Sequence, residues 1–121
     1  YNAHPSGIEC IEIIEHLPTN LGNAVKYVWR CGLKTSETPL RDLQSARWYT
    51  EREYRRAAIF ELDDWLHSKT DIVWRAFARQ VAGDGVGLLD RYLKALLGGS
   101  FHLMLRVLDE AIEELEEEVR R

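Results

Sequence analysis

The stretch PTNLGNAVKYVWRCGLK, residues 18–34, decides the fold class. Its proline ends any helix that precedes it, and Thr19 or Asn20 can cap a new one. Apolar side chains then recur at steps of three and four, the spacing of one buried helix face. These side chains are Leu21, Val25, Val28 and Trp29. Gly32 suits a left-handed residue at a helix end. The stretch therefore predicts an amphipathic helix that ends at Gly32.

Similar signals on both sides extend the helical pattern to the whole chain. Residues 6–9, Ser-Gly-Ile-Glu, have the form of a capping box for a helix running to about Leu17. Thr38 and Pro39 suit an N-cap and first residue, and no Gly or Pro follows before Gly83, so a long helix to about 67 is expected. Further helices are expected over 72–82 (with a start signal at 68–71), 86–97 and 101–121. No alternating strand pattern appears, so we predict an all-α bundle of six helices.

Composition limits the class of protein. The 121 residues are 45% hydrophobic and include four tryptophans, which is enough for one core. Residues 1–60 hold eight Lys and Arg against seven Asp and Glu, and residues 61–121 hold eight against thirteen. Duplex-binding domains carry a basic excess, so this balance argues against duplex nucleic acid as a partner. No apolar run reaches the ~18 residues of a membrane span, and the first residues do not resemble a secretion signal. Cys10 and Cys31 are expected to be reduced thiols in a cytoplasmic protein.

The polar side of the helix over residues 21–31 is the first candidate site. Asn23, Lys26, Tyr27 and Arg30 fall opposite the apolar face, and Lys34 follows the helix end. Arginine grips a phosphate in a fork and lysine adds a mobile charge, so this set can hold phosphates. The alternative is an ordinary solvated helix face.

The first helix offers a row of carboxylates. Ile11, Ile14 and Leu17 are expected to point inward, which places Glu9, Glu12 and His16 on one polar row with Glu15 beside it. Paired carboxylates can hold Mg²⁺, orient a hydroxyl or balance nearby cations. The alternative is that the row only keeps the helix soluble.

The long third helix has a packed face and an aromatic pair. Leu43, Ala46 and Thr50 suit the packed face, whereas Trp48 and Tyr49 cannot both point inward. We expect one of the two to meet a pocket or a partner. An aromatic ring beside Arg47 can stack on a nucleobase, and core or subunit packing is the alternative.

The last helix combines an apolar stripe with an acidic cluster. The stripe is expected to contain Leu103, Val107, Ile112, Leu115 and Val119, and five glutamates between 113 and 118 crowd the other side. A solvated face explains the glutamates, and a metal or partner surface is the alternative. The stripe spacing also allows coiled-coil-like packing, so we expect a homo-oligomer.

Three segments together resemble a known family: HPSGIECIE at 4–12, GNAVKYVWRCGLK at 22–34, and Asp-Leu, Ala and Trp-Tyr within 42–49. The chain resembles a small bacteriophage family of unknown function that includes a deoxynucleoside monophosphate kinase without a P-loop. The resemblance covers roughly residues 1–56, which we take as a core domain, with 57–121 as a helical extension. It implies a protein of the infected bacterial cytoplasm. The polar set it carries over is His4, Glu9, Glu12, Asn23, Lys26, Arg30, Lys34 and Asp42.

The leading hypothesis is a nucleotide-handling protein that transfers phosphate to deoxynucleoside monophosphates. Lys26 and Arg30, with Lys34, would hold phosphates, Glu9 and Glu12 would position Mg²⁺ or a sugar hydroxyl, and Trp48 or Tyr49 would stack the base. One rival is a binding protein that sequesters a nucleotide without turnover. A second is a protein–protein interaction or host-takeover module. A helical pyrophosphohydrolase would need more acids facing the first helix, for which the candidates are Glu61, Asp63 and Asp64.

Overall fold

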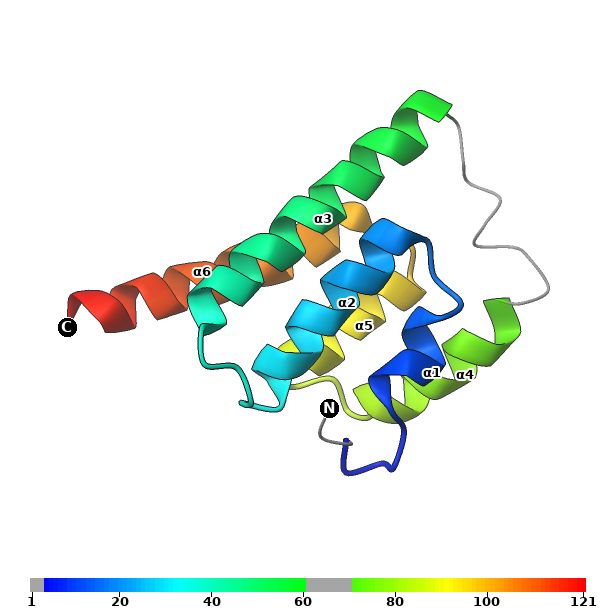
Figure 1. Ribbon diagram of the computed structural model, residues 1–121, viewed down its shortest axis with the longest axis horizontal. Helices are drawn as coiled ribbons and strands as arrows, with labels where there is room; N and C mark the ends of the chain where they lie inside the picture. The colour runs from blue at the N-terminus through cyan, green and yellow to red at the C-terminus, as the bar shows by residue number, and fades with distance from the viewer. Residues whose placement is uncertain (1–3, 61–70) are drawn as a thin grey trace.

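The computed structural model describes residues 4–60 and 71–121, and all regular secondary structure in these ranges is α-helical (Figure 1). The predicted all-α class with six helices is confirmed. The helices are α1 Cys10–Ile14, α2 Thr19–Gly32, α3 Pro39–Phe60, α4 Asp71–Ala82, α5 Leu88–Leu97 and α6 Phe101–Arg120. The expected end of the third helix near residue 67, the start signal at 68–70 and the acids at 61, 63 and 64 lie outside the described residues.

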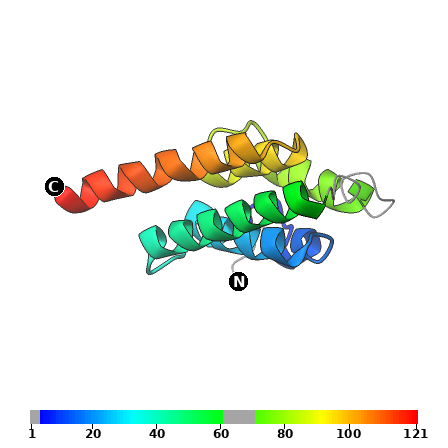
Figure 2. The ribbon, with the colours of Figure 1, turned by 90° about the horizontal axis from the view of Figure 1, so that it is seen from above.

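Each helix of the first half packs against one of the second half. The pairs are α1 with α4, α2 with α5, and α3 with α6, and α2 also lies along α3. Figure 2 shows the result as two layers, with α1, α2 and α3 in one and α5 and α6 in the other. No helix in the described ranges is both long and apolar enough to cross a membrane.

The interface between the layers is the hydrophobic core, and α2 supplies its centre. The predicted apolar face is confirmed, because Leu21, Val25, Val28 and Trp29 are all at most 1% exposed. The core also includes Trp74 of α4 and Tyr92 of α5, whose hydroxyl group lies 2.8 Å from the hydroxyl of Thr50 on α3. Burying one large apolar side chain contributes roughly 1.5–3 kcal/mol, so this face stabilises the attachment of α2 to the core.

Helix α2 ends at Gly32 as expected, but the reason for a glycine at this position differs from the one expected. Its backbone is not left-handed; Lys34, two residues later, adopts the positive φ of 58°. A Cβ at position 32 would lie 2.6 Å from the Cβ of Leu89 on α5. The glycine is therefore required by the close approach of α2 and α5, not by the helix end.

Three expectations about the first helix were wrong. It ends at Ile14, not near Leu17. The helix begins at Cys10 with Glu9 as its N-cap, not at Ser6, because Gly7 (φ 84°) closes a turn onto the carbonyl of His4. Ile11 is 53% exposed, and Ile13 takes the buried position. A helix of five residues has too few apolar positions for its buried side to be read from spacing alone.

The expected stripe of the last helix is confirmed in its middle and wrong at its two ends. Val107 is buried, and Ile112 and Leu115 pack against the core. Leu103 is 48% exposed and Val119 77% exposed, whereas Met104 and Leu108 are buried instead. Ser100 caps this helix by accepting a hydrogen bond from the backbone of Leu103. Two acids of α6 outside the cluster at 113–118 form ion pairs with other helices. Arg47 of α3 pairs with Asp109, and Arg91 of α5 pairs with Glu110, each at 2.6 Å.

Charge is divided between the two layers. Residues 19–56, which include α2 and most of α3, hold eight Lys and Arg against four Asp and Glu. Residues 101–121, which form α6, hold three against seven. The segment of α2 and α3 therefore carries a basic excess, although the whole chain is acidic.

The contact between Gly32 and Leu89 gives a stability prediction. Gly32→Ala forces a methyl group against α5 and should lower the free energy of unfolding by about 1–3 kcal/mol. Gly22→Ala is the matched control in the same helix, because its added Cβ meets only ordinary contacts at 3.5 and 3.6 Å. Alanine is the better helix former, so Gly22→Ala should leave stability unchanged or raise it by up to about 1 kcal/mol. Urea denaturation measures both, and equal effects of the two variants would contradict the close-approach account.

Candidate functional site

One polar strip of α2 faces α3. Asn20, Asn23, Tyr27 and Arg30 follow one another at steps of three and four residues, and each is only partly exposed. The ring of Tyr27 stacks on Tyr49 of α3, with centroids 6.1 Å apart and planes 14° apart. At the other end, the amide of Asn20 donates to the buried carboxylate of Glu53, 3.2 Å away. The contact with α3 thus leaves this strip half-buried.

Glu53 is satisfied by neighbouring side chains. Its carboxylate is fully buried and accepts two hydrogen bonds from Arg56, at 2.8 and 2.9 Å, besides the one from Asn20. A buried carboxylate needs such partners, and this one has them. The cluster joins α2 to α3 and leaves Glu53 without spare capacity for a ligand.

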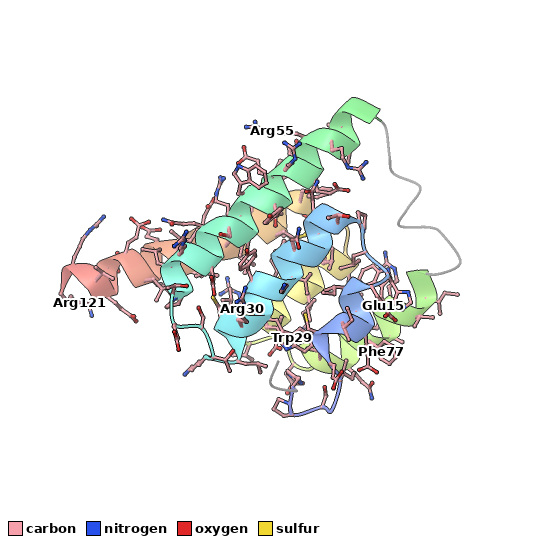
Figure 3. All side chains as sticks on the ribbon, in the orientation of Figure 1. Glu15, Trp29, Arg30, Arg55, Phe77 and Arg121 are labelled. Carbon is pink, nitrogen blue, oxygen red and sulfur yellow. The ribbon has the colours of Figure 1, made fainter. Side chains whose placement is uncertain are left out.

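Arg30 differs from the arginines of α3 that pair with carboxylates. Its guanidinium lies over the ring of Tyr27, with Cζ 5.0 Å from the centroid (the side chain is labelled in Figure 3). Its Nε is buried and has no hydrogen-bond partner within residues 4–60 and 71–121. By contrast, Arg47, Arg55 and Arg56 each pair with a carboxylate. Among the described residues, this partly buried guanidinium pairs with no carboxylate and leaves its Nε unsatisfied, which is the clearest ligand-binding feature of the strip.

Lys26 lies one turn before Arg30, and both charges act on the thiol of Cys10. Burial raises the pKa of Cys10 to about 11, and the two cations lower it in part. The pKa of Cys31 is likewise raised to about 11 by burial and by the charge of Asp42, while Ser36 and Arg30 lower it. Both cysteines are free thiols, as expected. The charge of Arg30 therefore acts on both thiols, whereas that of Lys26 acts on Cys10.

The N-terminal turn covers the neighbouring position on α2. The imidazole of His4 meets the ring of Trp29 edge-on, with centroids 5.9 Å apart, and its Nδ1 lies 2.9 Å from the hydroxyl of Ser6. Trp29 is 1% exposed, and its indole N–H has no partner among the described residues. His4 thus lies beside α2 at Trp29, the residue that precedes Arg30 in the sequence.

The carboxylates expected at the site have local structural roles. Glu12 accepts a hydrogen bond from the backbone N–H of Glu9 at 2.7 Å, and Glu9 itself is exposed. Asp42 is 8% exposed and accepts hydrogen bonds from the hydroxyls of Ser36 (2.6 Å) and Thr38 (3.4 Å). These contacts start α1 and close the α2–α3 loop. Among the described residues, no group of three or more His, Cys, Asp or Glu side chains could hold a metal ion.

The remaining expected residues are distributed around the strip. Arg47 points to α6, where Asp109 at 2.6 Å raises its pKa most, and it also pairs with Glu51 at 2.7 Å. Lys34 is exposed in the α2–α3 loop. Trp48 is 56% exposed and meets Tyr49 edge-on at 5.0 Å. Asn23, Lys26 and Arg30 are all partly exposed on α2, whereas Arg47 is turned away to α6.

Sequence reasoning missed two features of the site. The stack of Tyr27 on Tyr49 joins residues 22 positions apart, and no spacing signal reports such a contact. The polar partners in the loop, Ser36 and Thr38, were also missed. Their proximity to the N-cap of α3 and to Asp42 was the available signal, because hydroxyls before a helix commonly bond to its first turn.

Comparison with known proteins adds one match. Residues 1–51 match the model of a family described as a protein of unknown function, DUF3310. The matched segment contains α1, α2 and the first half of α3, and it includes the stacked tyrosines and Arg30. No curated protein and no solved structure matches the chain.

The position of Arg30 predicts the reactivity of both thiols. A nearby cation stabilises a thiolate, so Arg30→Gln should raise the pKa of Cys10 and of Cys31 further. At pH 9 the thiolate fraction, and hence the rate of alkylation by iodoacetamide, should fall at both cysteines. Lys26→Gln should slow Cys10 alone, because Lys26 acts on that thiol and not on Cys31. Peptide mapping by mass spectrometry gives the two rates, and a change at only one cysteine in Arg30→Gln would contradict the placement.

Proposed function

We propose that this protein binds a nucleotide on the α2–α3 side, with a phosphate at Arg30 and Lys26. The observation that carries the proposal is the half-buried guanidinium of Arg30, whose Nε has no partner in the described part of the chain. Enclosing a charge costs free energy unless an opposite charge or hydrogen-bond acceptors compensate for it. A phosphate group supplies both, and it matches the forked geometry of arginine.

The rings beside Arg30 suit the base of the same ligand. Tyr27 and Tyr49 form a stacked pair directly next to the guanidinium. Aromatic faces hold bases by stacking, and Asn23, one turn before Tyr27, can donate and accept hydrogen bonds. Phosphate and base contacts thus lie within one strip of α2 and its neighbour on α3.

The resemblance at residues 1–56 suggests the activity and the setting. We propose phosphoryl transfer to deoxynucleoside monophosphates, by a bacteriophage protein in the host cytoplasm, as the activity of this site. Lys26 and Arg30 would offset the charge that develops on the transferred group.

A second candidate, binding without turnover, is favoured by one observation. The carboxylate of Glu12 accepts a bond that starts α1, and that of Asp42 is occupied by two hydroxyls. Glu12 is one of the two acids that the phosphotransferase hypothesis uses, and Asp42 belongs to the polar set of the resemblance. A protein that only sequesters a nucleotide needs the cations and the rings but neither acid.

Arg30→Ala should weaken binding of a deoxynucleoside monophosphate by about 1.5–3 kcal/mol, the usual range for a hydrogen bond to a charged group. Isothermal titration calorimetry measures the dissociation constant, which should rise about 10- to 100-fold. Arg79→Ala is the matched control, because Arg79 is exposed on α4. Equal affinity of Arg30→Ala and the unaltered protein for all four monophosphates would remove Arg30 from the site.

Turnover separates the two candidates. The phosphotransferase proposal predicts that deoxynucleoside diphosphate accumulates when a monophosphate that binds is incubated with ATP and Mg²⁺, as measured by chromatography. If the monophosphate binds tightly but no nucleoside triphosphate yields a product, the phosphotransferase proposal is excluded and sequestration stands. If no nucleotide raises the melting temperature at millimolar concentration, both candidates fail and an interaction module remains.

A further inference from the structure

A second pair of arginine and aromatic ring lies beside the first. Arg52 places its Cζ 5.4 Å from the ring centroid of Trp48, as Arg30 does at 5.0 Å from that of Tyr27. Tyr49 joins the two pairs, because it stacks on Tyr27 at 6.1 Å and meets Trp48 edge-on at 5.0 Å. The result is one continuous series of contacts from α2 to α3. We refer to these five residues, Arg30, Tyr27, Tyr49, Trp48 and Arg52, as the aromatic–arginine row.

Packing among the described residues leaves Trp48 largely uncovered. It is 56% exposed, whereas Trp29 and Trp74 are each 1% exposed. A tryptophan at the surface gains little from burial, but its exposed face can stack on a base. Arg52 is exposed as well, and its charge is available to a phosphate next to that base.

The length of the row decides what kind of ligand it fits. Within one nucleotide, base and phosphate are joined through a single sugar. A ligand with its phosphate on Arg30 and its base against Tyr27 and Tyr49 leaves Trp48 and Arg52 unused, because they lie beyond Tyr49. A second base and a second phosphate are needed to occupy them.

We propose that the aromatic–arginine row binds two nucleotides joined by a phosphodiester bond, one at Tyr27 and Arg30 and the next at Trp48 and Arg52. This proposal rests on nucleotide binding at Arg30. A cyclic dinucleotide and a single-stranded oligonucleotide share this chemistry. The row contains two pairs of ring and arginine, so its footprint is two nucleotides.

The test compares ligands of increasing length on the full chain by isothermal titration calorimetry. The probes are dTMP, the dinucleotide pdTpdT, oligodeoxythymidylates of four and eight residues, and cyclic di-AMP with AMP as its reference. We expect either pdTpdT or cyclic di-AMP to bind about 5- to 150-fold more tightly than its mononucleotide, the gain from stacking one more base. The arm that shows the gain identifies the source of the ligand. The oligodeoxythymidylates of four and eight residues should bind, per binding site, with nearly the same affinity as pdTpdT.

Trp48→Ala should bring the ratio of dinucleotide to mononucleotide affinity close to one, and Trp48→Phe should retain most of it. Tyr54→Ala is the matched control: Tyr54 is also an exposed aromatic on α3, but it contacts Phe101 and His102 of α6 and lies outside the row. This control should keep the ratio. Thermal melts establish that each variant is folded.

The two proposals fail in different ways. If mononucleotides bind at Arg30 but neither dinucleotide binds more tightly, or if Trp48→Ala keeps the ratio, the two-nucleotide site is excluded and the proposed function stands. Affinity that keeps rising steeply from two to eight residues also overturns the two-nucleotide footprint. If no mononucleotide and no dinucleotide binds, nucleotide binding at Arg30 itself is wrong.

Discussion

Helix α2 is packed by three other helices, and this packing determines where its charges lie. Its apolar side meets α1 and α5, and the strip from Asn20 to Arg30 meets α3. The close approach at Gly32 fixes the distance to α5, because no side chain fits between the two backbones. Lys26 and Arg30 are therefore held half-buried between neighbouring elements, where a cation is less screened by water than on an open helix surface.

Two kinds of arginine can be distinguished in the α2–α3 layer. Arg47 and Arg56 complete ion pairs that join helices or satisfy a buried acid, so their charges are used within the fold. Arg30 and Arg52 lie instead over aromatic rings. A guanidinium over a ring keeps most of its hydrogen-bonding capacity, because the ring contacts its flat face and the N–H groups point outward in its plane. The structural arginines thus hold the layers together, and the ring-bound arginines remain for an anionic partner.

Much of the fold could be predicted from local signals. The apolar spacing in α2 placed Trp29 inside, and Thr38 with Pro39 placed the start of α3. Predictions failed where a three-dimensional contact overrides a local rule. Position 32 needs a glycine because Leu89, 57 positions away in the sequence, lies against it. Ile11 lies on a helix that is too short for its buried side to be predicted from spacing. For the site, spacing grouped Lys26 with Arg30, but it could not show that Arg47 would turn to Asp109 or that two tyrosines would stack across helices.

The central claim is that the charge of Arg30 receives the phosphate of a nucleotide. Nuclear magnetic resonance of the arginine Nε–Hε groups tests it directly, with the Arg30 signal assigned by its loss in Arg30→Lys. A titration with deoxythymidine monophosphate should shift this signal, and a titration with deoxythymidine, which lacks the phosphate, should leave it in place. An Arg30 signal that does not respond to any nucleotide, or that responds equally to the nucleoside, would contradict the account.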